Sequence, residues 1–257
     1  MPTGLNILGV RIDPVSMQDV IEWVRDAIDT RASDLYILVV NVAKLINARE
    51  DSTLRQTIDE ADLVGVDGMP LVWYSKLLPQ SLPEKVSGVD IMMTMFREGN
   101  HRGWSFFFLG ASSRVIDVVS RKFCAEFPHA PLKGHRDGYF SEMEESAIVE
   151  RIRLSGANIL LIGFGSPRKE MFVRRWKGQL GVNVVHGVGG SFDVYGGFTK
   201  RAPKWMQSSG LEWAYRLIQE PRRMILRYAV TNTKFVVLVI RDLSTRMLHQ
   251  LASHSSR

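Results

Sequence analysis

Short runs rich in β-branched and aromatic residues alternate with helical patterns along most of the chain. Three such runs are each followed by a helical pattern and a fourth run closes the series: 36–40 and 42–49, 104–109 and 112–127, 158–164 and 167–177, and 182–188. Strands that alternate with helices in this way are typical of βαβ units. The sequence therefore predicts an α/β fold with a Rossmann-like, mainly parallel sheet and helices on both faces.

The positive charge of the chain is concentrated at its C-terminal end. Residues 200–257 hold eleven Lys and Arg against three Asp and Glu, a net charge of +8, whereas the whole chain carries only +6 and residues 1–199 therefore carry −2. We expect an α/β core at 1–199 and a basic helical appendage at 200–257. Such an appendage suits a polyanion: anionic lipid headgroups, a diphosphate or nucleic acid.

No export signal or membrane anchor is evident in the sequence. The N-terminal residues lack a basic region followed by an apolar one, and the late apolar run at 235–240 is far shorter than the ~20 residues that a membrane-spanning helix needs. The single cysteine, Cys124, lies in an apolar-periodic stretch, so we expect a buried thiol and no disulfide. These features predict a cytoplasmic protein.

Several local patterns predict where helices begin and end. Ser141 with Glu144, and Ser209 with Glu212, have the spacing of a capping box. Ser166 precedes a proline and is expected to cap the next helix. Pro221 is expected to end or kink a helix, and residues 135–137 are expected to form a polar loop.

Polar residues follow four of the predicted strands. They are Asn41, Asp67, the segment 163–169 and the segment 187–193. Ligands of open parallel sheets bind beyond the carboxyl ends of the strands, so these four places are the candidate site.

Asp67 is the candidate catalytic base of this site. A carboxylate at a strand end can take a proton from an attacking hydroxyl and so act as a general base. The alternative is that Asp67 and Gly68 only form a turn, and the sequence leaves both interpretations open.

Two glycine-containing segments are candidate sites for a phosphate group. Gly163, Gly165 and Ser166 join a strand to a helix, where free backbone N–H groups can bind an anion and Lys169 can neutralise it. In the other segment, Gly189 and Gly190 permit close approach of a ligand, and hydrogen-bonding side chains follow them at Ser191 and Asp193. Both segments could equally be plain connections.

The sequence suggests no metal site. It has no Cys/His spacing typical of zinc and no Asp-x-Asp pair of the kind that holds a metal in many sugar-nucleotide enzymes. We therefore expect no obligatory metal and no other cofactor. His186 lies within a predicted strand and is expected to be a hydrogen-bonded core residue.

Seven motifs occur in an order that resembles one protein family. They are Asn41-Val42-Ala43-Lys44 with 48–51, 61–64 with Asp67-Gly68, 83–90, Gly138-Tyr139-Phe140, 163–170, 187–193, and 200–203 with 219–223. Together they resemble the WecG/TagA/CpsF glycosyltransferases over nearly the whole chain, from about Leu5 to Phe235.

The resemblance implies a metal-independent, inverting transfer of a sugar from a UDP-sugar to a sugar carried on a polyprenyl diphosphate. It places the protein at the inner face of the plasma membrane, with an anionic membrane surface as a partner, in the synthesis of a bacterial surface polysaccharide. It implies that Asp67 is the base, that Asn41 and Lys85 contribute to substrate binding, and that Arg216, Arg222 and Arg223 fold over the active site.

This chain departs from the family pattern at several positions. Val39 stands in place of a threonine found in many relatives, Lys85 in place of a frequent arginine, Lys169 in place of a frequent glutamine and Leu226 in place of an arginine. The resemblance therefore does not identify the donor sugar. The sequence also leaves open whether the protein forms a homo-oligomer.

Two other functions remain as alternatives. A nucleotide-dependent oxidoreductase could share the fold class, but no Gly-x-Gly-x-x-Gly opens the first helix. A nucleic-acid-binding module could use the basic appendage with its interleaved Trp205, Trp213 and Tyr215. Because a complete α/β domain is more than such binding requires, we expect no nucleic-acid partner.

Overall fold

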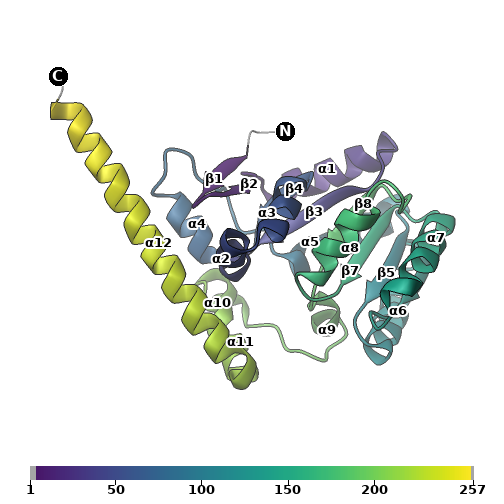
Figure 1. Cartoon of the computed structure of the whole chain (residues 1–257). Helices are drawn as coiled ribbons and strands as arrows, with labels where there is room; N and C mark the ends of the chain where they lie inside the picture. Colours follow the sequence, from purple (N-terminus) through teal and green to yellow (C-terminus); the bar gives the residue numbers. More distant parts are fainter. Residues whose placement is uncertain (1–3, 256–257) are drawn as a thin grey trace.

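The chain folds around one parallel sheet, shown in the computed structural model of Figure 1. The structure describes residues 4–255, except for the side chains of 208, 223, 224, 226, 227 and 249–255. Within this range the strands are β1 (Leu5–Ile7), β2 (Val10–Ile12), β3 (Leu35–Val40), β4 (Leu63–Val66), β5 (Phe106–Gly110), β6 (Leu132–Arg136), β7 (Ile159–Gly163) and β8 (Val184–Gly187).

Helices follow most of the strands. They are α1 (Met17–Asp29), α2 (Val42–Glu50), α3 (Ser52–Asp59), α4 (Met69–Ser75), α5 (Gly88–Arg102), α6 (Ser113–Glu126), the 3-10 helix η1 (Glu142–Glu144), α7 (Glu145–Ser155), α8 (Arg168–Trp176), α9 (Ser191–Tyr195), α10 (Lys204–Ser208), α11 (Glu212–Gln219) and α12 (Pro221–Ser255).

The main sheet has six strands in the order β4-β3-β8-β7-β5-β6, and every neighbouring pair is parallel. The central strands are short apolar runs such as Phe106–Gly110, buried along their full length. Complete burial is expected of a parallel sheet, because crossover helices cover both of its faces. The sheet confirms the predicted α/β class.

Two layers of helices cover the sheet. Alternate side chains of β3 point to opposite faces, so Tyr36 and Leu38 pack in the core beneath α2, α3, α7 and α8, whereas Ile37 packs beneath α1, α5, α6 and α9. The β1–β2 hairpin lies beside the first of these layers, near α3 and α4 (Figure 1).

The C-terminal region is helical and packs on the core. The long helix α12 runs along α2 (Figure 1), and Phe235 lies buried in the same hydrophobic core as Tyr74, with the two rings in an edge-to-face contact at 6.4 Å. Tyr74 Oη also donates a hydrogen bond to Asp242 of α12. The division into a core at 1–199 and an appendage at 200–257 stays a prediction.

Some predicted helix ends are confirmed. Ser141 and Glu144 form the reciprocal bonds of a capping box ahead of α7, and Gly156 ends that helix at a φ of 62°. Helix α11 ends at Gln219, two residues before Pro221, which begins α12. These signals are local, so the sequence alone determines them.

Other local predictions were wrong. Ser166 does not cap α8, because Pro167 is the N-cap residue and the helix begins only at Arg168. Ser209 does not cap α11, because its hydroxyl donates to the carbonyl of Met206. His135 and Arg136 belong to strand β6 instead of a loop.

Cys124 is also placed differently from the prediction. Its side chain is exposed on α6, while the neighbouring Phe123 fills the core. The buried face of α6 includes Val119 and Phe123, and Cys124 lies one residue past this face, so its thiol is on the outer side of the helix.

Candidate active site at the strand ends

The predicted site residues gather at one edge of the sheet. Because all six strands are parallel, Asn41 after β3, Asp67 after β4 and the glycines after β7 and β8 leave the sheet at the same edge. Helix α2 follows β3 on one face and α9 follows β8 on the other, so the chain diverges between these two adjacent strands. Divergence of this kind opens the crevice in which α/β proteins bind ligands.

Asp67 connects β4 to the helix that follows. Its backbone N–H donates to the carbonyl of Val40 on the adjacent strand, at 2.8 Å, and α4 begins two residues later at Met69. Asp67 and Gly68 therefore form a strand-to-helix junction, at the edge where ligands bind.

The charges around Asp67 act on its ionisation in opposite directions. Burial raises the pKa of the carboxyl above its usual value, and the negative charge of Glu212 adds to this effect. The positive charges of Arg216, Lys85 and Lys44 oppose it, but the pKa remains raised. A carboxylate with a raised pKa is better suited to accept a proton than an ordinary aspartate.

Ion pairs attach residues of the C-terminal region to the core at the strand ends. Glu212, the first residue of α11, forms an ion pair with the largely buried Lys85, and Arg216 follows one turn later. Arg201 binds Asp90 of α5 through two bonds of 2.7 Å, and its Nε lies 3.8 Å from Glu212. The strand-end edge is thus covered by residues distant in sequence.

Asn41 caps helix α2. Its Oδ1 accepts a hydrogen bond from the backbone N–H of Lys44 at 2.9 Å. Since the carbonyl oxygen serves the cap, the amide N–H groups are the part of this side chain that suits a ligand's oxygen atoms.

The glycines after β7 have different environments. A Cβ on Gly163 would lie 2.5 Å from Phe192, so close packing accounts for this glycine. Gly165 and Ser166 are exposed. Lys169 follows in the first turn of α8, buried, with its Nζ 3.3 Å from Glu170 Oε1.

The segment after β8 turns sharply into α9. Gly189 has a φ of 53°, a left-handed conformation that favours glycine. The buried Ser191 donates its hydroxyl hydrogen to the carbonyl of Val188 at 2.6 Å, and Asp193 is half-buried on α9. Gly190 precedes α9 directly. Ligand contacts for these residues stay a prediction.

The predicted arginines of the C-terminal region are not all brought to the site. Arg216 acts on Asp67, as described above, and Arg222 is exposed at the start of α12. The side chain of Arg223 lies outside the described residues. Arg168 serves the fold: its guanidinium lies 4.7 Å from the ring centres of both Phe140 and Phe164.

The sequence did not predict four charged residues that lie near the site: Lys44, Glu170, Arg201 and Glu212. Lys44 and Glu170 are buried, and they form an ion pair at 2.9 Å. A signal existed for both, because each occurs in a recognised motif, in the first turn of a helix that follows a strand.

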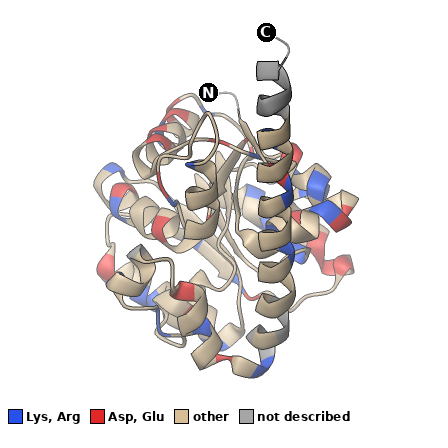
Figure 2. Cartoon of the chain, turned by 90° about the vertical axis from the view of Figure 1, so that its left-hand side faces the viewer, with Lys and Arg blue, Asp and Glu red and all other residues tan. Residues whose placement is uncertain are grey.

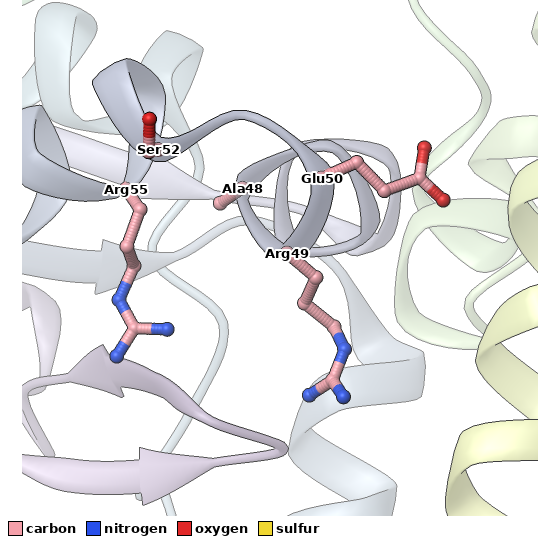
Figure 3. Close-up of a pocket in the computed structure, with 5 residues that line it drawn as sticks. All are labelled: Ala48, Arg49, Glu50, Ser52 and Arg55. Carbon is pink, nitrogen blue, oxygen red and sulfur yellow. The ribbon is translucent and has the colours of Figure 1, made fainter.

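A surface pocket lies elsewhere, between α2 and α3. Figure 3 shows its lining residues, with Arg49 and Arg55 pointing toward the β1–β2 hairpin, where Arg49 donates to the carbonyl of Leu8. This pocket of about 440 Å³ lies at the C-terminal end of α2, opposite to Asn41. It is therefore separate from the strand-end site.

Neither a metal cluster nor a membrane span is found in the described part of the chain. Across residues 4–255, no three His, Cys, Asp or Glu side chains come together as metal ligands. Over the same residues, no helix is both long enough and apolar enough to cross a bilayer.

The fold is a parallel α/β sheet with helices on both faces, and a half-buried carboxylate flanked by cationic side chains lies at its strand ends, where ligands of such sheets bind. The family model described as the glycosyl transferase WecG/TagA/CpsF family matches residues 5–248. The chain belongs to this family and is a glycosyltransferase. The match extends the sequence resemblance further along α12, from Phe235 to residue 248.

Proposed function

We propose that the protein is an inverting glycosyltransferase that moves a sugar from a UDP-sugar to a sugar carried on a polyprenyl diphosphate, in the synthesis of a bacterial surface polysaccharide. The observation that carries this proposal is the position of Asp67 directly after β4, at the strand ends where ligands bind, with the positive charges of Arg216, Lys85 and Lys44 acting on its carboxyl. Family membership supplies the glycosyl transfer, and the site suggests how it proceeds.

In this mechanism Asp67 accepts the proton of the acceptor hydroxyl. The hydroxyl oxygen attacks the anomeric carbon of the donor from the face opposite the diphosphate, and the bond between that carbon and the diphosphate oxygen breaks. UDP leaves with the electron pair, and the proton stays on Asp67. A single displacement inverts the anomeric configuration, and one base is sufficient for it.

Cationic side chains stabilise the departing UDP. The charges of Arg216 and Lys85 act on Asp67, and Arg222 and Arg223 lie in the first turn of α12. Lys169 and the glycine turn at Gly189 and Gly190 border the crevice from the β8 side. Fixed positive charge at a developing anion lowers the barrier without a metal.

The C-terminal region attaches the protein to the inner face of the membrane in this proposal. Several apolar side chains of the region are exposed beside its basic residues, among them Trp205 at 63%, Trp213 at 40% and Ile225 at 57%. Exposed aromatic and aliphatic side chains with arginines are typical of segments that lie in a membrane interface.

The proposal is tested by incubating the purified full-length protein with a panel of UDP-sugars and a polyprenyl-diphosphate-linked sugar, with and without excess chelator. We expect transfer from one UDP-α-sugar to give a β-linked product, detected by NMR, at the same rate in both conditions. A retained α-configuration would exclude the single displacement. Loss of activity with chelator, restored by Mg²⁺ or Mn²⁺, would contradict the metal-independent mechanism.

A further inference from the structure

Glu212 places a carboxylate between two cations of the candidate active site. Its Oε2 accepts a hydrogen bond from Nζ of Lys85, and its Oε1 lies 3.8 Å from Nε of Arg201. Glu212 is the first residue of α11, whereas Lys85 lies just before α5 in the core. One carboxylate from the C-terminal region therefore faces a positive charge with each of its two oxygens.

The core fixes the position of both cations. The side chain of Lys85 is only 11% exposed. Arg201 donates two hydrogen bonds of 2.7 Å from Nη1 and Nη2 to the carboxylate of Asp90 on α5, and its ion pair with Glu212 uses Nε instead. Lysine and arginine side chains that are held in this way bind the oxygen atoms of carboxylates and of phosphates alike.

Several negative charges share these cations. Burial and the charge of Glu212 raise the pKa of Asp67. The hydrogen bond to Asp90 raises the pKa of Arg201, and the charge of Glu212 raises it further. A diphosphate would add more negative charge at the same place, and like charges side by side oppose binding. Glu212 and a diphosphate therefore compete for Lys85.

Glu212 can leave the two cations while the rest of the chain stays folded. Its side chain is 27% exposed and lies at the first position of α11, so a change of rotamer is enough to turn the carboxylate toward solvent. Asp90, in contrast, lies inside the first turn of α5 and also binds the hydroxyl of Ser87. Of the two carboxylates that pair with Arg201, Glu212 is the one that a ligand displaces.

We propose that Lys85 and Arg201 form the subsite for the diphosphate of the nucleotide donor, and that the carboxylate of Glu212 occupies this subsite until the donor displaces it. This inference rests on the proposed function and adds to it the place of the diphosphate and an internal competitor. The subsite lies beside Asp67, as the mechanism requires, because the hydroxyl that Asp67 deprotonates attacks the carbon that carries the diphosphate.

The test measures the dissociation constant of UDP for the full-length protein by calorimetry, at one salt concentration. Glu212→Gln keeps the shape of the side chain and removes the competing charge. It should bind UDP about tenfold more tightly, as expected if about one tenth of the wild-type molecules have the subsite open. If Glu212 only fastened α11 to the core, its loss would weaken UDP binding or leave it unchanged.

Three further variants test the two cations. Lys85→Gln and Arg201→Gln should each weaken UDP binding about tenfold, because each removes a positive charge from the subsite. In the double variant Lys85→Gln with Glu212→Gln, the gain from the second change should be smaller than in the wild-type background, since both residues act through one ammonium group. Equal gains in the two backgrounds would show that Glu212 acts at a distance and would overturn the inference.

Glu50→Gln is the matched control. Glu50 forms an ion pair with Lys234 of α12, so it also joins the core to the C-terminal region. It is the last of the nine residues of α2, about 13 Å from the end that Asn41 caps. Exposed charges are largely screened beyond about 8 Å at physiological salt. This variant should therefore bind UDP as the wild type does.

The outcomes separate this inference from the function on which it rests. If the wild-type protein binds UDP and a folded Glu212→Gln binds it no more tightly, Glu212 does not compete and the inference is wrong. If Lys85→Gln and Arg201→Gln bind UDP like the wild type, the diphosphate lies elsewhere and the inference is also wrong. If neither the wild type nor Glu212→Gln binds UDP, the proposed donor is wrong and both proposals fall.

Discussion

At the scale of single residues, the surroundings of Asp67 shift the ionisation of its carboxyl. Burial raises its pKa, and the surrounding charges adjust it in both directions. Two of those charges, Glu212 and Arg216, lie one helical turn apart on α11. The C-terminal region therefore covers the site and also shifts the pKa of Asp67, the residue proposed to take the proton.

This tuning predicts opposite shifts in the pH profile of sugar transfer. The base must be ionised, so activity falls as the pH drops through the pKa of Asp67. Arg216→Met removes a positive charge that lowers this pKa and should move the acid limb to higher pH. Glu212→Gln removes a negative charge that raises it and should move the limb to lower pH. Rate profiles that coincide for wild type and both variants would show that α11 does not act on the base.

His186 predicts a loss of stability in acid. Its folded-state pKa of about 4 lies below the unfolded value of about 6.5, chiefly because the ring is buried. The contribution of the neutral His186 ring to the free energy of unfolding is complete above pH 6.5. It is lost as the pH falls toward 4, because His186 of the unfolded state binds a proton at a higher pH than His186 of the folded state. Between pH 7 and pH 5 this amounts to about 2 kcal/mol.

Chemical denaturation at pH 7 and pH 5 measures this effect. The free energy of unfolding should fall by about 2 kcal/mol more in the wild type than in His186→Gln, which does not titrate in this range. All other groups titrate alike in the two proteins and cancel in the comparison. An equal fall in both proteins would mean that His186 is not held neutral.

The sequence located Asp67 and Asn41, because residues that follow strands of a parallel sheet must meet at one edge. The sequence did not predict the ion pairs of Lys44 with Glu170 and of Lys85 with Glu212. The two residues of each pair lie 126 and 127 residues apart along the chain, and only the three-dimensional fold brings them together.

At the scale of elements, α12 has two different faces. Phe235 and Thr231 are buried against the core, whereas Val236 and Ile240 are 53% and 58% exposed. The helix has 35 residues, about 50 Å in length, and Figure 2 shows it along the front of the molecule with few charged positions in its middle part. An exposed apolar face on a helix with basic residues suits a membrane interface.

This face predicts the determinants of membrane attachment. Val236→Asp with Ile240→Asp should weaken binding to vesicles of anionic lipid, measured by sedimentation, because it places two carboxylates where lipid is expected. Binding should also weaken with salt, since each basic residue contributes about 1 kcal/mol at a charged surface.

Met143→Asp with Leu154→Asp is the control for this prediction. These residues are 91% and 71% exposed on η1 and α7, at the end of the sheet away from α12 (Figure 1). The control adds the same charge and should bind vesicles as the wild type does. Equal binding by all three proteins would exclude α12 as the attachment surface.

The two incorrect predictions at the start of α8 and at β6 have local causes. Serine is a common N-cap residue, but Pro167 occupies the N-cap of α8, so the helix begins one residue later than expected from Ser166. Residues 132–136 are largely polar, so nothing in their sequence indicates an edge strand, although β6 pairs with β5 along most of its length. Composition identifies buried central strands more readily than edge strands.

At the scale of the whole molecule, the basic C-terminal residues meet the rest of the chain at the candidate active site. Residues 1–199 carry −2 and residues 200–257 carry +8. The ion pairs of Lys85 with Glu212 and of Arg201 with Asp90 join them beside Asp67. In the proposed mechanism, membrane attachment and closure of the site therefore involve the same C-terminal region.

The central claim is that Asp67 takes the proton of the acceptor, and Asp67→Asn tests it most directly. The amide keeps the shape of the side chain but cannot serve as a base. The turnover rate with saturating donor and acceptor should therefore fall at least about a hundredfold. Thermal stability and the affinity for UDP should stay close to those of the wild type. Turnover near the wild-type rate in a folded, UDP-binding variant would contradict the claim and remove Asp67 from the mechanism.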